Sequence, residues 1–350
     1  MIELDGNYGE GGGQIVRSAL ALSTLLGKPF EISNIRKGRS NPGLKAQHLS
    51  CITALKDMCD PEVEGAVLGS DSLTYTPKKY DPKTVKLDIG TAGSITLLLQ
   101  CLLFPASLSK QKSRFVITGG TDVKWSMQMD YLINIVLPQL KRFATVSINV
   151  EKRGYYPKGQ GKVDVNVHPK FMDDVAFLPS LDLTKQKKLI CIRGTSHASK
   201  ELSKAEVAER QARAAQHILS KYNVPVNIQT IYSETECTGT GITLWALFGQ
   251  DDLDLLNPII LGSDNLGEKG KKAELVGEEC AKALIDEIST NAPVDKHLAD
   301  NLIPYMGVFG GKIKVSEITN HTLTNIYVTE QFLDVKFNID EEKKIISVEK

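Results

Sequence analysis

The N-terminal half of this 350-residue chain repeats one local pattern, and that repetition constrains its fold more than any other feature. Residues 2–5 alternate like a strand, a glycine-rich turn follows at 9–13, and residues 14–26 have the periodicity of a helix. The same order returns over residues 85–108, again with small residues at the turn. These units predict duplicated α/β modules, with a third, less distinct copy in the C-terminal third.

The pattern of predicted elements changes after Pro169. A strand is predicted over residues 189–193, followed by a charged helix over residues 204–222 with Ser203 as its cap, and then by further strands. We therefore expect an α/β (α+β) fold with a discontinuous large domain of repeated units. The predicted boundaries are residues 1–183 plus 289–350 for the large domain and 184–288 for a smaller inserted α/β domain.

The turn that precedes the first predicted helix, residues 10–14, has the features of an anion site. Its three consecutive glycines let the backbone approach a ligand closely. The N terminus of a helix also offers free N–H groups and a positive dipole end. No Gly-Lys-Ser/Thr follows, and the spacing differs from a dinucleotide fingerprint. A phosphate site and a plain turn that packs helix against sheet both fit.

A basic loop follows at residues 34–48, which contain four basic residues and no acidic one. The four are Arg36, Lys37, Arg39 and Lys45. Glycine and proline shape this segment as a loop, and cations on a rigid loop suit several phosphates at once. Arg17, one turn into the first predicted helix, is expected to point the same way. The alternative is a solvated surface loop.

A third candidate is the loop at residues 153–161, which mixes cations, glycines and the aromatic pair Tyr155 and Tyr156. Aromatic stacking and phosphate contacts are what single-stranded RNA recognition requires. The alternative is a hairpin loop with a chance aromatic pair.

Composition sets limits on these interpretations. Lys plus Arg equals Asp plus Glu, 42 each, so the surface as a whole is not basic. If the protein binds a nucleic acid, its basic residues must be concentrated at one part of the surface. No stretch reaches the roughly 20 apolar residues of a membrane helix, and no signal peptide is visible, so we expect a cytoplasmic protein. The six cysteines lack a CxxC pair, which favours buried thiols over zinc. None of the six histidines has metal-ligand spacing.

Taken in order, these blocks resemble the RNA 3′-terminal phosphate cyclase family. Residues 5–17 and 35–49 are similar to its opening, which is highly specific. Further similar blocks are found at residues 90–100, 119–122, 153–161, 297–301 and 321–326. The resemblance covers nearly the whole chain. It implies repeated units like the C-terminal domain of a bacterial translation initiation factor, with an inserted α/β domain.

The resemblance also implies a reaction, the ATP-dependent conversion of an RNA 3′-phosphate to a 2′,3′-cyclic phosphate. A histidine attacks the α-phosphorus of ATP and releases pyrophosphate, and AMP then passes to the RNA 3′-phosphate. The neighbouring 2′-hydroxyl finally expels AMP. The scheme is chemically sensible, because adenylation turns a phosphate oxygen into part of a good leaving group and neutral imidazole is a good nucleophile near pH 7.

By motif position, the resemblance implies a role for each site residue. His321 is the expected nucleophile, and Glu10 is expected to hold Mg²⁺ or Mn²⁺. Expected at the phosphates, the RNA 3′ end or the leaving group are Arg17, Arg36, Arg39, Gln47 and His48. Expected at the adenine and ribose of ATP are Gln100, His297, Leu298, Ala299, Asp300 and Asn301. His321 and the opening block must then meet in space. The oligomeric state, monomer or homodimer, stays open.

Two departures from the family pattern stand out. The signature at residues 153–161 usually ends in three glycines, and Gln160 replaces the middle one here. Residues 123–127 lack the expected prolines and alanines, which puts nucleobase contacts there in doubt.

Two other functional classes compete with the enzyme. Non-catalytic relatives that act in ribosome assembly lose the nucleophilic histidine and part of the arginine loop, whereas His321, Arg36, Arg39 and Glu10 are all present here. Enolpyruvyl transferases are distant architectural cousins that need no ATP, and fold alone does not separate them from the cyclases. The contexts of Gln47, His48 and His321 favour the cyclase.

Overall fold

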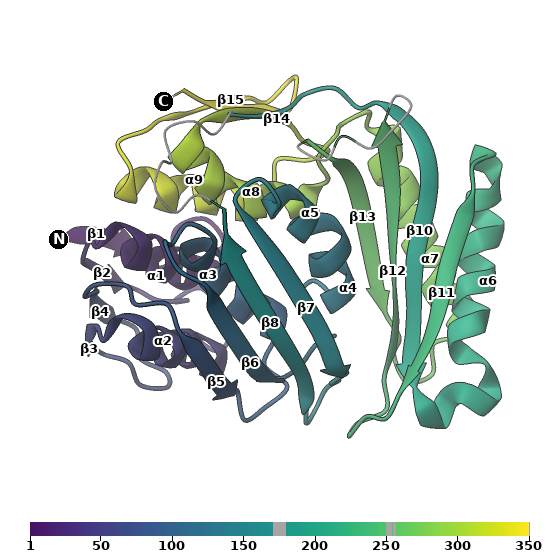
Figure 1. Ribbon diagram of the computed structural model, residues 1–350, viewed down its shortest axis with the longest axis horizontal. Helices are drawn as coiled ribbons and strands as arrows, with labels where there is room; N and C mark the ends of the chain where they lie inside the picture. Colours follow the sequence, from purple (N-terminus) through teal and green to yellow (C-terminus); the bar gives the residue numbers. More distant parts are fainter. Residues whose placement is uncertain (171–179, 250–253, 255–256, 350) are drawn as a thin grey trace.

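The sequence repeat corresponds to three copies of one β-α-β-α-β-β unit in the computed structural model, which describes residues 1–170, 180–249, 254 and 257–349 (Figure 1). The first unit consists of β1 (Ile2–Asp5), α1 (Gln14–Leu26), β2 (Phe30–Ser33), α2 (Ala46–Cys59), β3 (Glu62–Glu64) and β4 (Leu73–Thr76). Its sheet has the order β1-β2-β4-β3, in which β1 and β2 are parallel and the other neighbours are antiparallel.

The second unit repeats this topology with longer strands. It consists of β5 (Thr84–Asp88), α3 (Ile95–Ser107), β6 (Ser113–Gly119), α4 (Met129–Tyr131), the π-helix η1 (Leu132–Val136), α5 (Leu137–Leu140), β7 (Ala144–Lys152) and β8 (Gly161–Pro169). The sheet order is β5-β6-β8-β7, with β5 and β6 parallel. Sheet order and strand directions are thus the same in both units, as the sequence repeat predicted.

The third unit is split by the insertion. It consists of β9 (Leu181–Leu183), α8 (Lys296–Phe309), β14 (Gly311–Lys314), α9 (Asn320–Phe332), β15 (Phe337–Asp340) and β16 (Ile345–Val348). Its order, β9-β14-β16-β15, again has the first two strands parallel. The third copy predicted for the C-terminal third is therefore present.

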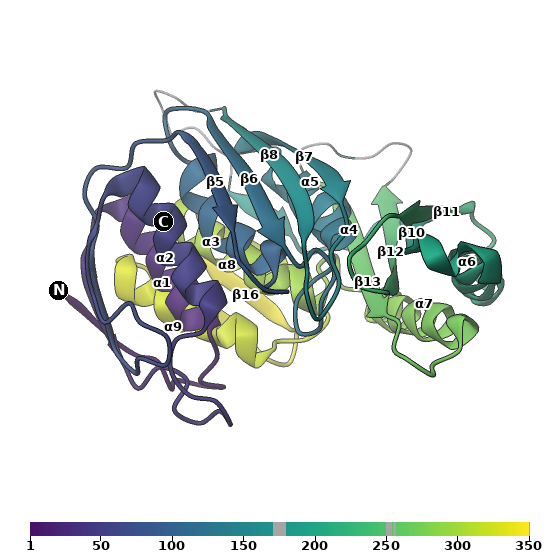
Figure 2. The ribbon, with the colours of Figure 1, turned by 90° about the horizontal axis from the view of Figure 1, so that it is seen from below.

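Between β9 and α8 lies a separate α/β unit. It consists of β10 (Lys188–Ser199), the 3₁₀ turn η3 (Lys200–Ala205), α6 (Val207–Leu219), the 3₁₀ turn η4 (Ser220–Tyr222), β11 (Val226–Ser233), β12 (Thr240–Gly249), β13 (Ile259–Leu266) and α7 (Ala273–Ser289). The strands form a sheet of order β11-β10-β12-β13, against which α6 and α7 pack (Figure 2). The helix predicted over residues 204–222 is shorter, because Glu206 adopts a left-handed conformation between η3 and α6.

Helices of all three units pack together, with the sheets outside them (Figure 2). Helix α1 contacts α3 of the second unit and α9 of the third. Ser18 donates to the Asn325 side chain at 2.6 Å, and the Lys28 ammonium donates to the Phe332 carbonyl at 2.7 Å. The predicted contact between the C-terminal third and the N-terminal module is confirmed. In the described part of the chain, no helix has the length and apolar character needed to cross a membrane.

The loop at residues 153–161 has a structural role that the sequence did not indicate. Arg153 is buried and pairs with Asp122 at 3.0 Å and with Asp130 at 2.6 Å. Tyr155 is also buried and shares a 2.7 Å hydrogen bond with His197 of the inserted sheet. The interpretation of these two side chains as an RNA-stacking surface is therefore wrong, because neither reaches solvent.

The backbone conformation at Gln160 explains why the family usually has glycine at this position. Its φ of 58° lies in the left-handed region, which glycine adopts without strain. The position is therefore conformationally constrained, and the glutamine tolerates it. The glycines on either side of the loop are more restricted, since a Cβ on Gly154 would lie 2.3 Å from the Gly161 nitrogen.

Replacing Arg153 by methionine should lower the free energy of unfolding by about 3–5 kcal/mol, because two carboxylates lose their buried counter-ion. Chemical denaturation measures this loss. Arg114→Met is the matched control, since the Arg114 side chain is half-exposed beside Asp164 and its loss should cost much less. Equal stability of the two variants would contradict the structural role of Arg153.

Candidate active site

The residues predicted to act at the phosphates lie around the N terminus of α1. Three segments converge there: the glycine-rich turn between β1 and α1, the basic loop between β2 and α2, and the first turn of α9. Helix α1 follows Gly13 without a side-chain cap, so its first N–H groups face this meeting point free of a capping side chain.

His321 lies in the first turn of α9, which Thr319 caps through a 3.1 Å bond to the Thr322 amide. Its side chain is 53% exposed, and its Nε2 lies 3.6 Å from the Glu10 carboxylate. Its Nδ1 hydrogen-bonds the Gln14 side-chain oxygen. The imidazole is thus held on one side and accessible on the other.

Glu10 lies between this histidine and the basic loop. Arg39 donates to the same carboxylate oxygen, Oε2, at 3.2 Å. Both side chains are partly exposed, so the pair is reachable from solvent. A partly exposed carboxylate such as that of Glu10 is the type of oxygen ligand that Mg²⁺ or Mn²⁺ accepts.

A second part of the site consists of N–H donors without acceptors. Arg17 Nε, Arg36 Nε and His48 Nε2 are buried and find no hydrogen-bond partner within the described residues. Each unsatisfied buried donor costs about 1–3 kcal/mol. Burial is the main reason why the pKa values of the Arg17 and Arg36 guanidinium groups are lowered. These groups are arranged for an anion that would accept from them.

His48 is neutral, and its tautomer is defined. Its Nδ1 accepts from the Lys45 amide at 2.9 Å, so the proton is on Nε2. Burial and the neighbouring Arg17, Arg36 and Lys45 charges lower the pKa of His48 to about 3. Nε2–H faces the helix start, because a Cβ placed on Gly13 would lie 2.1 Å from it.

The basic loop is held rigidly against the first unit. The Arg36 amide donates to the Gly6 carbonyl at 3.3 Å, and the Gly38 amide donates to the Asn7 side chain at 2.9 Å. Arg36 has a φ of 57°, a conformation that non-glycine residues rarely adopt. Gln47 lies half-buried in the first turn of α2 and makes no side-chain hydrogen bond to the described residues.

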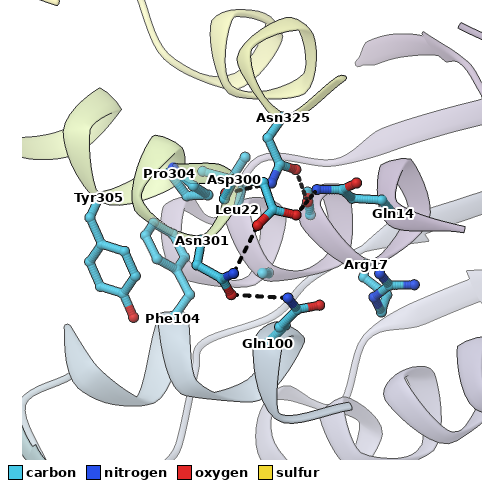
Figure 3. Close-up of a pocket in the computed structure, with 12 residues that line it drawn as sticks. Gln14, Arg17, Leu22, Gln100, Phe104, Asp300, Asn301, Pro304, Tyr305 and Asn325 are labelled. Atoms are coloured by element: carbon cyan, nitrogen blue, oxygen red, sulfur yellow. Dashed lines mark hydrogen bonds between the residues drawn. The ribbon is translucent and has the colours of Figure 1, made fainter. Parts of the chain in front are cut away.

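A small cavity of about 40 Å³ lies beside Gln14 and Arg17, between α1, α3 and α8 (Figure 3). Gln100 donates to Asn301 at 2.9 Å, and Asn301 donates to Asp300 at 2.8 Å. Burial raises the pKa of Asp300 to about 7, although the Arg17 charge and the Gln14 hydrogen bond oppose this.

The other predicted nucleotide contacts, all on α8, differ in exposure. The Leu298 and Ala299 side chains are completely buried in the core, whereas the His297 ring is exposed and meets Tyr131 edge-on at 6.3 Å. Of these three, His297 is the side chain that a ligand can reach without a change in the core.

Sequence reasoning did not nominate two residues that the structure brings to this site. Gln14 links His321 to Asp300, and Asn325 links α9 to α1 and α8. Gln14 belongs to the glycine-turn motif, so its position was a usable signal. Asn325 lies four residues after His321, one turn along the same helix face, and that spacing could have indicated it.

One further group of possible metal ligands lies away from this site. Asp122, Asp130 and His197 offer ligand atoms within 4.8 Å of one another. Arg153 already occupies the space and neutralises both carboxylates. Glu10 is therefore the better candidate for a metal that takes part in chemistry.

Comparison with known proteins agrees with the geometry. A family model described as RNA 3′-terminal phosphate cyclase matches residues 8–339. A protein named RNA 3′-terminal phosphate cyclase from Pyrococcus abyssi is 46% identical over 343 residues, which cover 98% of this chain and 96% of the relative. Proteins with the same name from Pyrococcus furiosus (44% identical, covering 97% of this chain and 95% of the relative) and Methanococcoides burtonii (43%, covering 99% of each) are also similar.

A methyl group on Gly13 should disturb the donor cluster, because it would clash with the His48 ring. Gly13→Ala should lower the melting temperature and reduce the additional stabilisation expected from inorganic pyrophosphate as a ligand of the folded state. Thermal unfolding with and without pyrophosphate measures both effects.

Gly12→Ala is the matched control. Neither glycine has a left-handed φ, and a Cβ on Gly12 would lie 3.7 Å from its nearest neighbour, the Arg39 guanidinium. This variant should keep both properties. An unchanged pyrophosphate response in Gly13→Ala would show that His48 and the helix start do not bind the anion.

Proposed function

This chain belongs to the RNA 3′-terminal phosphate cyclase family, and we propose from its site that it converts an RNA 3′-phosphate to a 2′,3′-cyclic phosphate with consumption of ATP. The observation that carries the proposal is the position of the accessible His321 imidazole beside Glu10, at the edge of a cluster of unsatisfied donors. A nucleophile next to a ready anion site is what nucleotidyl transfer requires.

In this mechanism, His321 Nε2 forms a bond to the α-phosphorus of ATP while the bond to the β-phosphate oxygen breaks and pyrophosphate leaves. An oxygen of the RNA 3′-phosphate then takes AMP from the imidazole. The terminal 2′-hydroxyl attacks the activated phosphorus, loses its proton and releases AMP. The exposure of His321 on the side of Glu10 supports the first step.

The cations and donors have the task of holding phosphates. Arg17, Arg36 and His48 offer buried N–H groups, and these need no reorganisation as charge develops. Arg39, partly exposed beside Glu10, would contact the phosphates nearest the metal. Gln47, in the same helical turn as His48, would complete the contacts at the RNA 3′-phosphate or the leaving group.

The donor set at Glu10 fits a hard divalent ion that is bound mainly by phosphate oxygens. The chain supplies one carboxylate there, and the ATP phosphates and water would supply the remaining ligands of Mg²⁺ or Mn²⁺. When bound, the ion would neutralise phosphate charge. The ion pair with Arg39 holds the Glu10 carboxylate towards His321.

The adenosine of ATP would lie towards α8 and α3. The polar side chains that can contact it are Gln100, His297, Asp300 and Asn301. Leu298 and Ala299 would shape this side of the site from within the core. All six cysteines are free thiols, which agrees with the cytoplasmic location that we propose.

The non-catalytic alternative, a cyclase-like ribosome-assembly factor, is not favoured. Relatives of that kind lack the nucleophilic histidine or part of the arginine loop, and both are present in this chain at one site. An enolpyruvyl transferase forms no nucleotidyl-histidine, so it would not need an accessible histidine beside a cluster of anion-binding donors.

The nucleophile can be tested directly. Protein incubated with ATP labelled at the α-phosphate and Mg²⁺ or Mn²⁺ should acquire label that survives alkali but not acid. His321→Ala should acquire none, whereas His217→Ala, which changes an exposed histidine of α6, should label like the wild type. A wild type that stays unlabelled, or cyclisation of a 3′-phosphorylated RNA without ATP, would contradict the mechanism.

The metal role of Glu10 gives a separate prediction. In Glu10→Gln, half-maximal labelling should require at least about tenfold more Mg²⁺, because an amide binds hard cations less well than a carboxylate. A titration of labelling rate against Mg²⁺ measures the shift. Glu31→Gln, at an exposed position of β2, is the control and should match the wild type. An unshifted titration for Glu10→Gln would remove Glu10 from metal binding.

A further inference from the structure

Gln14 is hydrogen-bonded at both ends of its side-chain amide. Its oxygen hydrogen-bonds His321 Nδ1, and its nitrogen donates to Asp300 Oδ2 at 3.1 Å. Gln14 is only 7% exposed, so water does not compete freely for either end of its amide. The three residues come from α1, α8 and α9, and therefore from two different repeat units.

Asp300 determines which way the amide points. Above its pKa of about 7, the Asp300 carboxylate only accepts, and its other oxygen already accepts from the Asn301 side-chain amide at 2.8 Å. If the Gln14 amide were reversed, its oxygen would face the carboxylate and its NH₂ would face His321. The orientation with the Gln14 oxygen towards His321 is therefore the one that satisfies every partner.

This orientation determines the tautomer of the histidine. An amide oxygen cannot donate, so the proton of neutral His321 must be on Nδ1. The lone pair is then on Nε2, which is the nitrogen 3.6 Å from the Glu10 carboxylate. The nucleophilic atom consequently faces the expected position of the ATP phosphates.

The helix that carries His321 is braced against the same residues. Asn325 donates to the Asp300 backbone carbonyl at 2.7 Å and accepts from Ser18 at 2.6 Å. Asn325 is one turn after His321, so this brace sets the distance between the imidazole and the Gln14 amide.

We propose that Gln14, oriented by Asp300, is a positioning residue that keeps the Nδ1 proton on His321 before and after adenylation. The inference rests on the histidyl-adenylate mechanism proposed above. When Nε2 bonds to the α-phosphorus and pyrophosphate leaves with the electron pair, the ring retains its Nδ1 proton and becomes positively charged. Gln14 cannot remove that proton, because an amide oxygen is not a base near neutral pH.

The retained proton has a consequence for the second step. As an oxygen of the RNA phosphate attacks, the N–P bond breaks and its electron pair returns to Nε2, which yields neutral imidazole. A cationic ring leaves more readily than a deprotonated one, which would depart as an anion. An amide at position 14 thus serves both steps, whereas a carboxylate there would form an ion pair with the cationic ring and so stabilise the intermediate against AMP transfer.

Nitrogen NMR of protein with ¹⁵N-labelled histidine tests the tautomer without ATP, with His321→Ala identifying the His321 signals. Neutral His321 should be protonated on Nδ1 in the wild type and should lose this preference in Gln14→Ala. Gln216→Ala, a glutamine of α6, should keep the wild-type spectrum. A wild-type His321 protonated on Nε2 would overturn the proposal, even if Gln14→Ala fails to fold.

The kinetic test compares two steps. Gln14→Ala should slow self-adenylation by about tenfold or more, with little change in the KM for ATP. Gln14→Glu should still adenylate but transfer AMP to a 3′-phosphorylated RNA at least about tenfold more slowly, so that labelled protein accumulates. Transfer at the wild-type rate in Gln14→Glu would contradict the proposal. A wild type that takes up no label but shows the Nδ1 proton would instead refute only the proposed function.

Discussion

The packing of α1 against α9 is the contact on which the rest of the site depends. It joins the first and third repeat units, and it brings His321 to the turn that carries Glu10 and Gln14. The contact is secured at both ends of the helices, by the Ser18–Asn325 hydrogen bond and by the bond from Lys28 to the carbonyl at the end of α9. The backbone that carries His321 is therefore fixed by packed helices, which favours precise positioning.

Burying cations and N–H donors without acceptors works against folding, at about 1–3 kcal/mol for each unsatisfied donor. The fold sustains this cost because the donors are attached to well-packed elements: Arg17 is on α1 and His48 is on α2, and both face inward. Backbone hydrogen bonds fix the basic loop to its surroundings, such as those from the Ile35 amide to the Asp71 carbonyl and from the Leu44 amide to the Ser70 carbonyl. A phosphate would then bind donors that are already in place.

Much of the architecture follows from local patterns. The alternating strands and the small-residue turns made the repeat visible, and the change in sequence pattern after Pro169 indicated the insertion. The residues that the sequence misassigned are those whose roles depend on contacts between units. Arg153 and Tyr155 have the composition of an RNA-binding loop, yet their partners, Asp130 and His197, come from segments that periodicity cannot place beside them. Gln14 was visible in its motif, but its link to Asp300 is a tertiary property.

The inserted unit is connected to this chemistry through α8. Asp295 caps that helix, and its carboxylate also accepts from Tyr131 of the second unit at 2.5 Å and from the Gly262 amide of the inserted sheet at 2.9 Å. One turn later, the same helix presents Asp300, which orients Gln14. A displacement of the inserted sheet would therefore move the start of α8 and, with it, the acceptor that determines the direction of the amide. The insertion thus helps to support the candidate site, although among the described residues none of its own side chains contacts His321.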